Sequence, residues 1–378
     1  MTLDGLVRAR RLLVCVGSGG VGKTTTAASI ALRAALAGRR VLVLTIDPAR
    51  RLANSLGLTE FGNTEVRIDL GQRTLSGSGK GGELWAMMLD ARSTLDDVIG
   101  RVAKDVATRD AIYGNKIYRH IAGSFSGSQE YMATERLYDV HRSDRYDLIV
   151  LDTPPVKNAL DFLESPGRLA RFLDRQIMKW FLTPYVEERV FGKRLIMGTS
   201  AVVYRLLGHI FGREFLDELS IFFKLFGELY DGFRERHEAV GKLFVAPSTS
   251  FLVVSAPTEP SVDVATFFLD ELRARGLPLG GVLVNQVHRC SNTSPDVGAL
   301  LGDEARAIDP ATAPQLLARL GAAHRRLRDL AMLEAGRVDE LRRAAGPEVW
   351  VRTVPRLRGE VNDLEGLLTL HDHLFDPS

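Results

Sequence analysis

The chain has few cysteines, and they are not arranged to hold a metal or a disulfide framework. Its 378 residues include two cysteines, Cys15 and Cys290, which lie far apart and form no Cys-x-x-Cys pair. We therefore predict neither a disulfide scaffold nor a structural zinc site. This cysteine usage is typical of a reducing compartment, so we expect a cytoplasmic protein.

The sequence also lacks a long apolar run and a strong net charge. Its longest uncharged stretch, Leu243 to Thr258, contains two prolines and several hydroxyl residues, so it is too short and too polar to span a bilayer. We expect no separate signal peptide before the first apolar run. The formal net charge of +2 provides no global field for nucleic acid. We expect no nucleic-acid partner, while peripheral contact with a membrane stays open.

Short apolar runs alternate with helical stretches along the chain. Continuous runs of valine, isoleucine and leucine are typical of strands that are covered on both faces, and they occur at 12–16, 40–46, 147–151, 251–254, 282–284 and 349–351. With 45% hydrophobic and 25% charged residues, the chain can bury a large core. We predict one α/β domain over residues 1–378, with a mostly parallel sheet flanked by helices.

A glycine-rich stretch joins the first apolar run to a helix-forming run. It consists of Gly17, Ser18, Gly19, Gly20, Val21, Gly22, Lys23 and Thr24, followed by Thr25, and it fits the pattern G-x-x-x-x-G-K-[ST]. Glycines let successive amide groups converge on phosphate oxygens, and the dipole of the following helix adds to that attraction. We therefore predict a P-loop NTPase in which Lys23 reaches the β and γ phosphates and Thr24 places its hydroxyl on Mg²⁺.

Polar residues follow three of the apolar runs: Asp47, Asp152 and Asn285. Ligands of open parallel sheets bind at the carboxyl ends of the strands. We therefore expect these three residues near the bound ligand. For Asp47 an alternative stays open, because an aspartate before Pro48 also suits an ordinary turn.

Two regions depart from the alternation of strand and helix. Residues from about 92 to 140 and from about 160 to 242 have helical periodicity, and the second region is rich in phenylalanine, including Phe222, Phe223 and Phe226. We predict a helical insertion subdomain. Its aromatic rings either fill its own core or line a groove for an apolar peptide or helix, and both can hold.

Several short motifs occur together in the order found in one known family. They are Gly-Gly-Val-Gly-Lys-Thr-Thr-Thr in the loop, Asp47-Pro48-Ala49-Arg50, Asp152-Thr153-Pro154-Pro155, Asn285-Gln286, and Pro355 before Gly359-Glu360-Val361. In these motifs the chain resembles the ArsA-type ATPases, namely the arsenite-pump ATPases and the guided-entry ATPases that target tail-anchored membrane proteins. The resemblance covers nearly the whole chain and is to a single-unit member with the deviant phosphate loop.

The resemblance implies a role for each matching residue. Asp47 matches the aspartate that positions or activates the attacking water, beside the catalytic Lys23, and Asp152 matches the carboxylate that holds Mg²⁺ together with Thr24. The adenine of ATP is expected to contact Asn285, Gln286 and Pro355, because an amide can both donate to and accept from the base. The family also implies a dimer whose ATP cycle opens and closes helical insertions around an apolar membrane-protein client.

One residue departs from the family pattern. Most members with this loop carry a lysine that reaches the partner's phosphates, and here that position is Ser18. The serine leaves three questions open: whether the dimer is a homodimer or a heterodimer with a related subunit, whether Arg50 or another arginine substitutes, and whether the chain only binds nucleotide. An arsenite or anion pump subunit is a further alternative, although the cluster of three cysteines for arsenite is missing.

Overall fold

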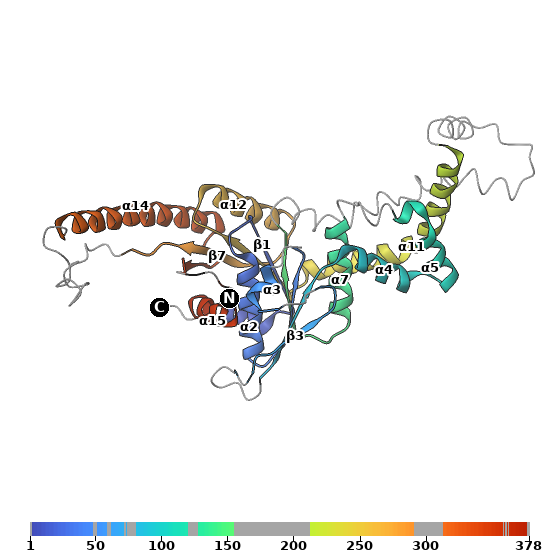
Figure 1. Ribbon diagram of the computed structural model, residues 1–378, viewed down its shortest axis with the longest axis horizontal. Helices are drawn as coiled ribbons and strands as arrows, with labels where there is room; N and C mark the ends of the chain where they lie inside the picture. The colour runs from blue at the N-terminus through green and yellow to red at the C-terminus, as the bar shows by residue number, and fades with distance from the viewer. Residues whose placement is uncertain are drawn as a thin grey trace, which may run out of the picture.

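An eight-stranded sheet forms the centre of the described chain, in the order β3-β4-β2-β5-β1-β6-β7-β8 (Figure 1). This computed structural model describes residues 2–47, 51–58, 62–71, 73, 81–119, 128–154, 212–290, 313–357, 359, 361 and 363–375. The strands are β1 (Leu12–Gly17), β2 (Arg40–Thr45), β3 (Val66–Ile68), β4 (Glu83–Met88), β5 (Leu148–Asp152), β6 (Thr249–Ser255), β7 (Leu279–Val287) and β8 (Val351–Pro355). All neighbours pair in parallel except β3 and β4. The predicted α/β fold with a mostly parallel sheet is confirmed.

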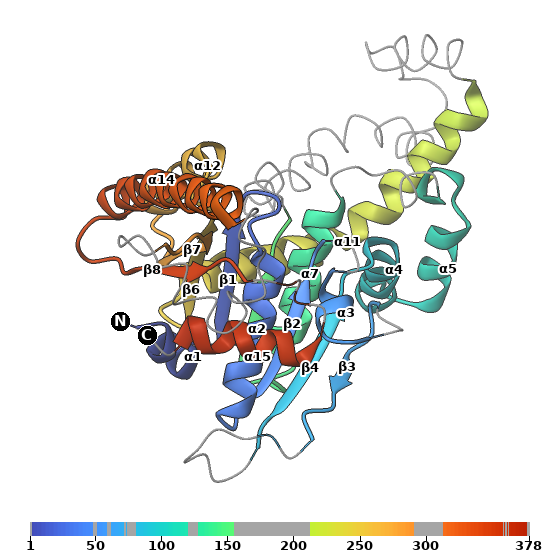
Figure 2. The same cartoon turned by 60° about the vertical axis from the view of Figure 1, so that its left-hand side comes forward.

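Alternation along the buried strands divides the core into two layers. Leu13 and Cys15 of β1 belong to a cluster with α1 (Leu3–Ala9), α2 (Lys23–Leu36), α3 (Arg51–Ser55) and α15 (Leu364–Phe375). Leu12 and Val14 point to the other face, where they join α4 (Ala91–Val102), α5 (Val106–Gly114), α7 (Ser128–Arg142), α11 (Arg213–Val245), α12 (Glu259–Ala274) and α14 (Ala313–Ala345). Figure 2 shows α2 and α15 on the opposite side of the sheet from α12 and α14.

Two strands and several strand boundaries differ from the sequence prediction. β3 is only three residues long, and β4 reads Glu-Leu-Trp-Ala-Met-Met without a β-branched residue, so neither gives a clear strand pattern. Pairing with β2 makes β4 a strand nonetheless. β8 begins at Val351 and extends to Pro355. Trp350, just before it, packs on Gly281, where a Cβ would lie 2.1 Å from Trp350 Cε2.

The predicted helical regions are described in part. α4, α5 and α7 fall within the first region, α11 overlaps the second, and residues 155–211 lie outside the described residues. Met132 and Leu137 of α7 share one buried cluster with Leu42 and Ile149 of the sheet, so whether these helices form a separate subdomain stays a prediction. None of the helices that the structure describes is long and apolar enough to cross a membrane.

Phe222 belongs to the core, since it is 2% exposed and lies in the cluster that α7 shares with the sheet. The side chains of Phe223 and Phe226 lie outside the described part of α11. Of the two alternatives for the aromatic rings, core packing therefore holds for Phe222. The groove alternative therefore depends on other apolar residues of α11.

Candidate nucleotide-binding site

The loop between β1 and α2 has glycine where no other residue fits. Gly17 has φ +153°, and a Cβ there would lie 2.0 Å from the carbonyl oxygen of Val254 on β6. Gly22 has φ +89°, and a Cβ there would lie 2.4 Å from Nδ2 of Asn285. Both positions combine a left-handed backbone with a close neighbour. The loop therefore packs tightly against the ends of β6 and β7, and α2 begins directly after it.

Asn285 and Gln286 at the end of β7 hold the loop. Asn285 Nδ2 donates a hydrogen bond of 2.9 Å to the Val21 carbonyl, and Gln286 Nε2 donates one of 3.1 Å to the Gly20 carbonyl. Gln286 has φ +62°, a left-handed conformation that non-glycine residues seldom adopt. The structure thus brings both residues to the predicted pocket. Their contact with adenine stays a prediction, while their contact with the loop is a role that the sequence analysis did not identify.

Lys23 and Ser18 close the loop on itself. Lys23 Nζ donates a 2.8 Å hydrogen bond to the Ser18 carbonyl, and the side chain is buried. The Ser18 hydroxyl lies 3.1 Å from that of Ser261, which lies 2.9 Å from that of Thr258 at the start of α12. Ser18 therefore contacts a helix of its own chain. Lys23 is the positive side chain that phosphates would meet within the loop.

Asp152 lies at the end of β5 with no exposed surface. Its Oδ2 accepts hydrogen bonds from the hydroxyls of Thr24 at 2.7 Å and Thr45 at 2.9 Å. Burial raises the pKa of Asp152 to about 6, the nearby Asp47 charge adds to that rise, and the two threonine hydrogen bonds and Lys23 oppose it. A buried carboxylate with a raised pKa is stabilised by a cation.

The environment of Asp152 fits Mg²⁺. Its Oδ1 is buried and has no hydrogen-bond partner among the described residues, while the Thr24 hydroxyl lies beside the other oxygen. Mg²⁺ binds through one or two protein oxygens together with phosphates and waters, and does not need a dedicated cage. The described residues contain no cluster of three His, Cys, Asp or Glu side chains, which agrees with that kind of site.

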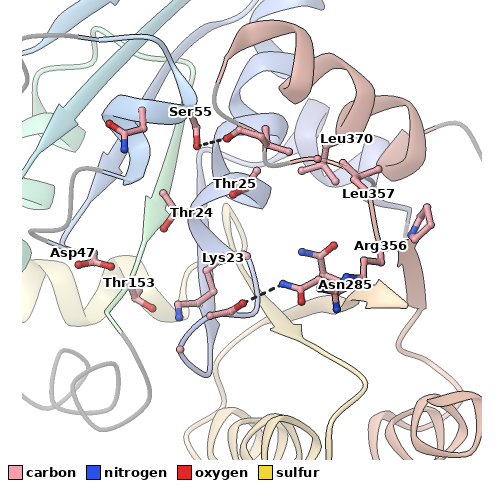
Figure 3. A pocket seen from close by; sticks show the side chains of 18 residues that line it. Lys23, Thr24, Thr25, Asp47, Ser55, Thr153, Asn285, Arg356, Leu357 and Leu370 are labelled. Atoms are coloured by element: carbon pink, nitrogen blue, oxygen red, sulfur yellow. Dashed lines mark hydrogen bonds between the residues drawn. The ribbon is translucent and has the colours of Figure 1, made fainter. Parts of the chain in front are cut away.

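A pocket of about 670 Å³ brings most of the predicted residues together; Gly17, Ser18, Val21 and Asp152 are not among its described lining residues. Asp47 and Thr153 lie on one side of Lys23 and Thr24, and Asn285 lies on the other (Figure 3). The pocket is lined by Gly19, Gly20, Gly22, Lys23, Thr24, Thr25, Asp47, Asn54, Ser55, Thr153, Asn285, Gln286, Pro355, Arg356, Leu357, Gly359, Val361 and Leu370. The Asp47 amide donates to the Thr45 hydroxyl at 3.2 Å, which orders the strand end before the undescribed residues 48–50.

Thr45 beside Asp152 and several lining residues of the pocket were not predicted from the sequence. Thr45 is an ordinary strand threonine in the sequence, and only the pairing of β2 with β5 brings it to Asp152. Asn54 and Ser55 belong to α3, a five-residue helix that is too short to give a periodic pattern. Arg356 and Leu357 directly follow Pro355, so the sequence offered a signal there, namely their position after the end of β8.

Comparison with known proteins agrees with this site. The family model described as anion-transporting ATPase matches residues 10–296. The chain therefore belongs to the anion-transporting ATPase family. The matched range includes the loop, Asp47, Asp152 and Asn285, and it ends before α14.

Relatives of this family member include fungal ATPases. It is 32% identical over 160 residues to ATPase get3 of Aspergillus terreus, covering 42% of this chain and 43% of that protein. It is 28% identical over 168 residues to ATPase GET3 of Podospora anserina, covering 44% and 46%, so these matches span less than half of each relative. ATPase get3 of Pyrenophora tritici-repentis is 26% identical over 276 residues, with 72% of both chains covered.

The cysteines of this anion-transporting ATPase family member lie away from the pocket surface. Cys15 is completely buried in β1, and burial, with the nearby Asp152 charge, raises the pKa of its thiol. A thiol that resists ionisation is a poor ligand for a soft ion. Cys290 is partly exposed, and its Sγ lies 3.7 Å from Nδ1 of His324 on α14.

Proposed function

We propose that this chain is a Mg²⁺-dependent ATPase that works as a dimer. The observation that carries the proposal is the convergence of Lys23, Thr24, Asp47 and Asn285 on one pocket, with the buried carboxylate of Asp152 beneath Thr24. This is the arrangement that phosphoryl transfer requires, since catalysis there is mainly positioning and charge stabilisation.

Each residue has a specific task in this proposal. Lys23 Nζ exchanges its hydrogen bond with Ser18 for the β and γ phosphates, while the loop amides bind their oxygens. Asp47 accepts a hydrogen bond from the attacking water and aligns it with the γ phosphate. Thr24 and Asp152 hold Mg²⁺, which when bound neutralises charge that develops on the phosphates. Asn285, Gln286 and Pro355 lie where they can contact adenine.

Tail-anchored-type membrane proteins are the proposed clients, because the sequence resembles guided-entry ATPases and α11 exposes apolar side chains. Phe215 is 42% exposed and Ile221 is 44% exposed. Large exposed apolar side chains on one helix suit capture of an apolar segment. Nucleotide-dependent movement of this helix, which packs on α7 through the Arg236–Asp139 ion pair, would open and close the capture surface.

The client proposal is tested by comparing exposed and buried rings on the same helix. Phe215→Ser together with Ile221→Ser should weaken capture of a transmembrane-type peptide and leave the melting temperature near that of the parent. Phe222→Ala is the matched buried control and should lower stability by about 3–5 kcal/mol. Unchanged peptide capture by the double variant would remove α11 from the client site.

Anion transport is the second candidate, favoured by the family description. The buried, ionisation-resistant Cys15 argues against arsenite as the transported ion. Stimulation of phosphate release by arsenite or another oxyanion, measured on the purified chain, would support the pump subunit in place of a targeting role.

A non-hydrolysing partner is the third candidate, favoured by Ser18. Its hydroxyl contacts Ser261 of the same chain and supplies no positive charge to a partner's phosphates. The deciding experiment measures phosphate release by the purified chain alone and mixed with homologous subunits. Ser18→Lys should raise the rate of the chain alone if the missing charge limits it, whereas a flat rate with an intact dimer would show that another residue supplies that charge.

A further inference from the structure

The helix α14 carries an apolar stripe that continues beyond the body of the protein. Its C-terminal half packs into the core through Val338, Leu341 and Ala345. The same helical face continues toward the N-terminus through leucines that are 36–38% exposed, namely Leu316, Leu320, Leu327 and Leu330. This half of the helix extends past the sheet in Figure 1. An exposed apolar stripe that continues the buried face of the same helix is suited to binding a partner.

The spacing of the stripe indicates one partner helix. Leu316, Leu320, Ala323, Leu327 and Leu330 follow one another at alternating steps of four and three residues, which is the spacing of heptad positions a and d. Such a seam is narrow and fits a single facing helix. A helix lying on a membrane needs a broad apolar face that usually includes aromatic side chains, and residues 313–345 contain no Phe, Trp or Tyr.

The charge beside the seam specifies the chemistry of the partner. Residues 315–333 include four arginines and one aspartate. Arg319 and Arg326 are exposed and each directly precedes a seam leucine, which places them at the g positions that flank such a seam. In an antiparallel pair with a second copy of this helix, the arginines at g would face each other. In a parallel pair, the second copy would offer them no acidic residue at e. A partner with glutamate or aspartate beside its own apolar seam fits instead.

The base of the exposed half is firmly held. Glu334 is buried, and its two carboxylate oxygens bind His288, with Oε2 accepting from the backbone N at 2.7 Å and Oε1 lying 2.8 Å from Nδ1. Arg337 Nη1 donates to the Pro257 carbonyl at 3.1 Å. A helix anchored in this way loses little freedom when a partner binds. His288 lies two residues after Gln286. The exposed half of α14 therefore begins next to β7, the strand that holds the nucleotide-binding loop.

We propose that the seam of α14, from Leu316 to Leu330, is a docking surface for one amphipathic helix of another protein, with acidic residues on the side of its apolar seam that faces Arg319 and Arg326. The surface lies outside the residues that the family model matches. The proposal does not depend on the proposed ATPase activity.

Fluorescence anisotropy with the full-length chain tests the proposal directly. The probe is a labelled synthetic helix of about three heptads, with Leu at a and d and Glu at e and g, and its matched counterpart has Lys at e and g. The acidic peptide should bind, the lysine peptide should not, and added NaCl should weaken the binding. Leu320→Gln with Leu327→Gln should weaken it at least about tenfold, as expected for loss of central apolar contacts. Met332→Gln is the control, because Met332 is 61% exposed on the opposite face of the helix.

Any one of the following results would overturn the proposal. The first is no binding of the acidic peptide by the folded parent chain, which includes the case in which another part of this chain covers the seam. The second is a parent dimer that the double leucine variant dissociates in light scattering without any peptide, since the seam would then join two copies. The third is equal binding of both peptides, or binding to vesicles of anionic lipid that the double variant abolishes.

Discussion

The nucleotide-binding edge of the sheet and the exposed half of α14 differ in how their residues depend on one another. At the edge, Lys23 and Thr24 are buried and hydrogen-bonded to Ser18 and Asp152 respectively. On α14 the seam leucines are 36–38% exposed. Single changes at the edge should therefore disturb a connected unit, while changes on the seam should affect only what binds there.

The largest expected effect is on ATP hydrolysis at the nucleotide-binding edge. Asp47→Asn should slow ATP hydrolysis about a hundredfold or more, as expected when a water-orienting group is lost, and should keep nucleotide affinity. Phosphate-release kinetics beside a binding titration checks this. A variant that turns over ATP at the parent rate would make Asp47 an ordinary turn residue.

A smaller loss is expected at the clamp on the loop. Asn285→Ala removes the 2.9 Å hydrogen bond to the Val21 carbonyl and the amide expected to face adenine. ATP affinity should fall about tenfold, the size of one or two lost hydrogen bonds. Isothermal titration with ATP, and with triphosphate alone as the control, separates the two roles. Loss of affinity for both ligands points to the loop, and loss for ATP alone points to adenine.

The pKa of Asp152 predicts how stability without nucleotide depends on pH. Because burial raises this pKa to about 6, the ionised carboxylate destabilises the folded state at neutral pH. The contribution of Asp152 to the free energy of unfolding is most favourable below its pKa in the unfolded chain. This contribution falls by up to about 3 kcal/mol as the pH rises through about 6. Asp152→Asn should therefore melt higher than the parent at pH 8, and the gap should narrow toward pH 4. A gap that does not change with pH would contradict the account.

The smallest expected effect belongs to α14. Leu320→Gln with Leu327→Gln should change the free energy of unfolding by no more than about 0.5 kcal/mol, because exposed positions contribute little, and should leave ATP binding unchanged. Leu341→Ala, on the same face but completely buried, should cost about 2–5 kcal/mol. Thermal melts of the two variants compare the exposed and buried halves of one helix. A large loss for the exposed pair would show that the seam is already covered.

The sequence predicted the parts of the site whose pattern is local. The loop from Gly17 to Thr24 joins a strand to a helix as expected, and Asp152 follows a strand of continuous apolar residues. Thr45 could not be predicted, because its role arises from strand order. The contact of Ser18 with Ser261 joins residues far apart in the chain, and no periodicity signals such a contact. The residue types of β4 gave no strand pattern in the sequence, and β4 is a strand because it pairs with β2.

The most direct test of the nucleotide site is isothermal titration of the parent and of Lys23→Ala with ATP and Mg²⁺. Lys23 is buried and donates to the loop at 2.8 Å, so it is the positive charge available to the phosphates within the loop. The account predicts that the parent binds and that the variant shows no measurable binding while it melts close to the parent. Equal affinities in the two proteins would contradict the assignment of this loop as the phosphate-binding site.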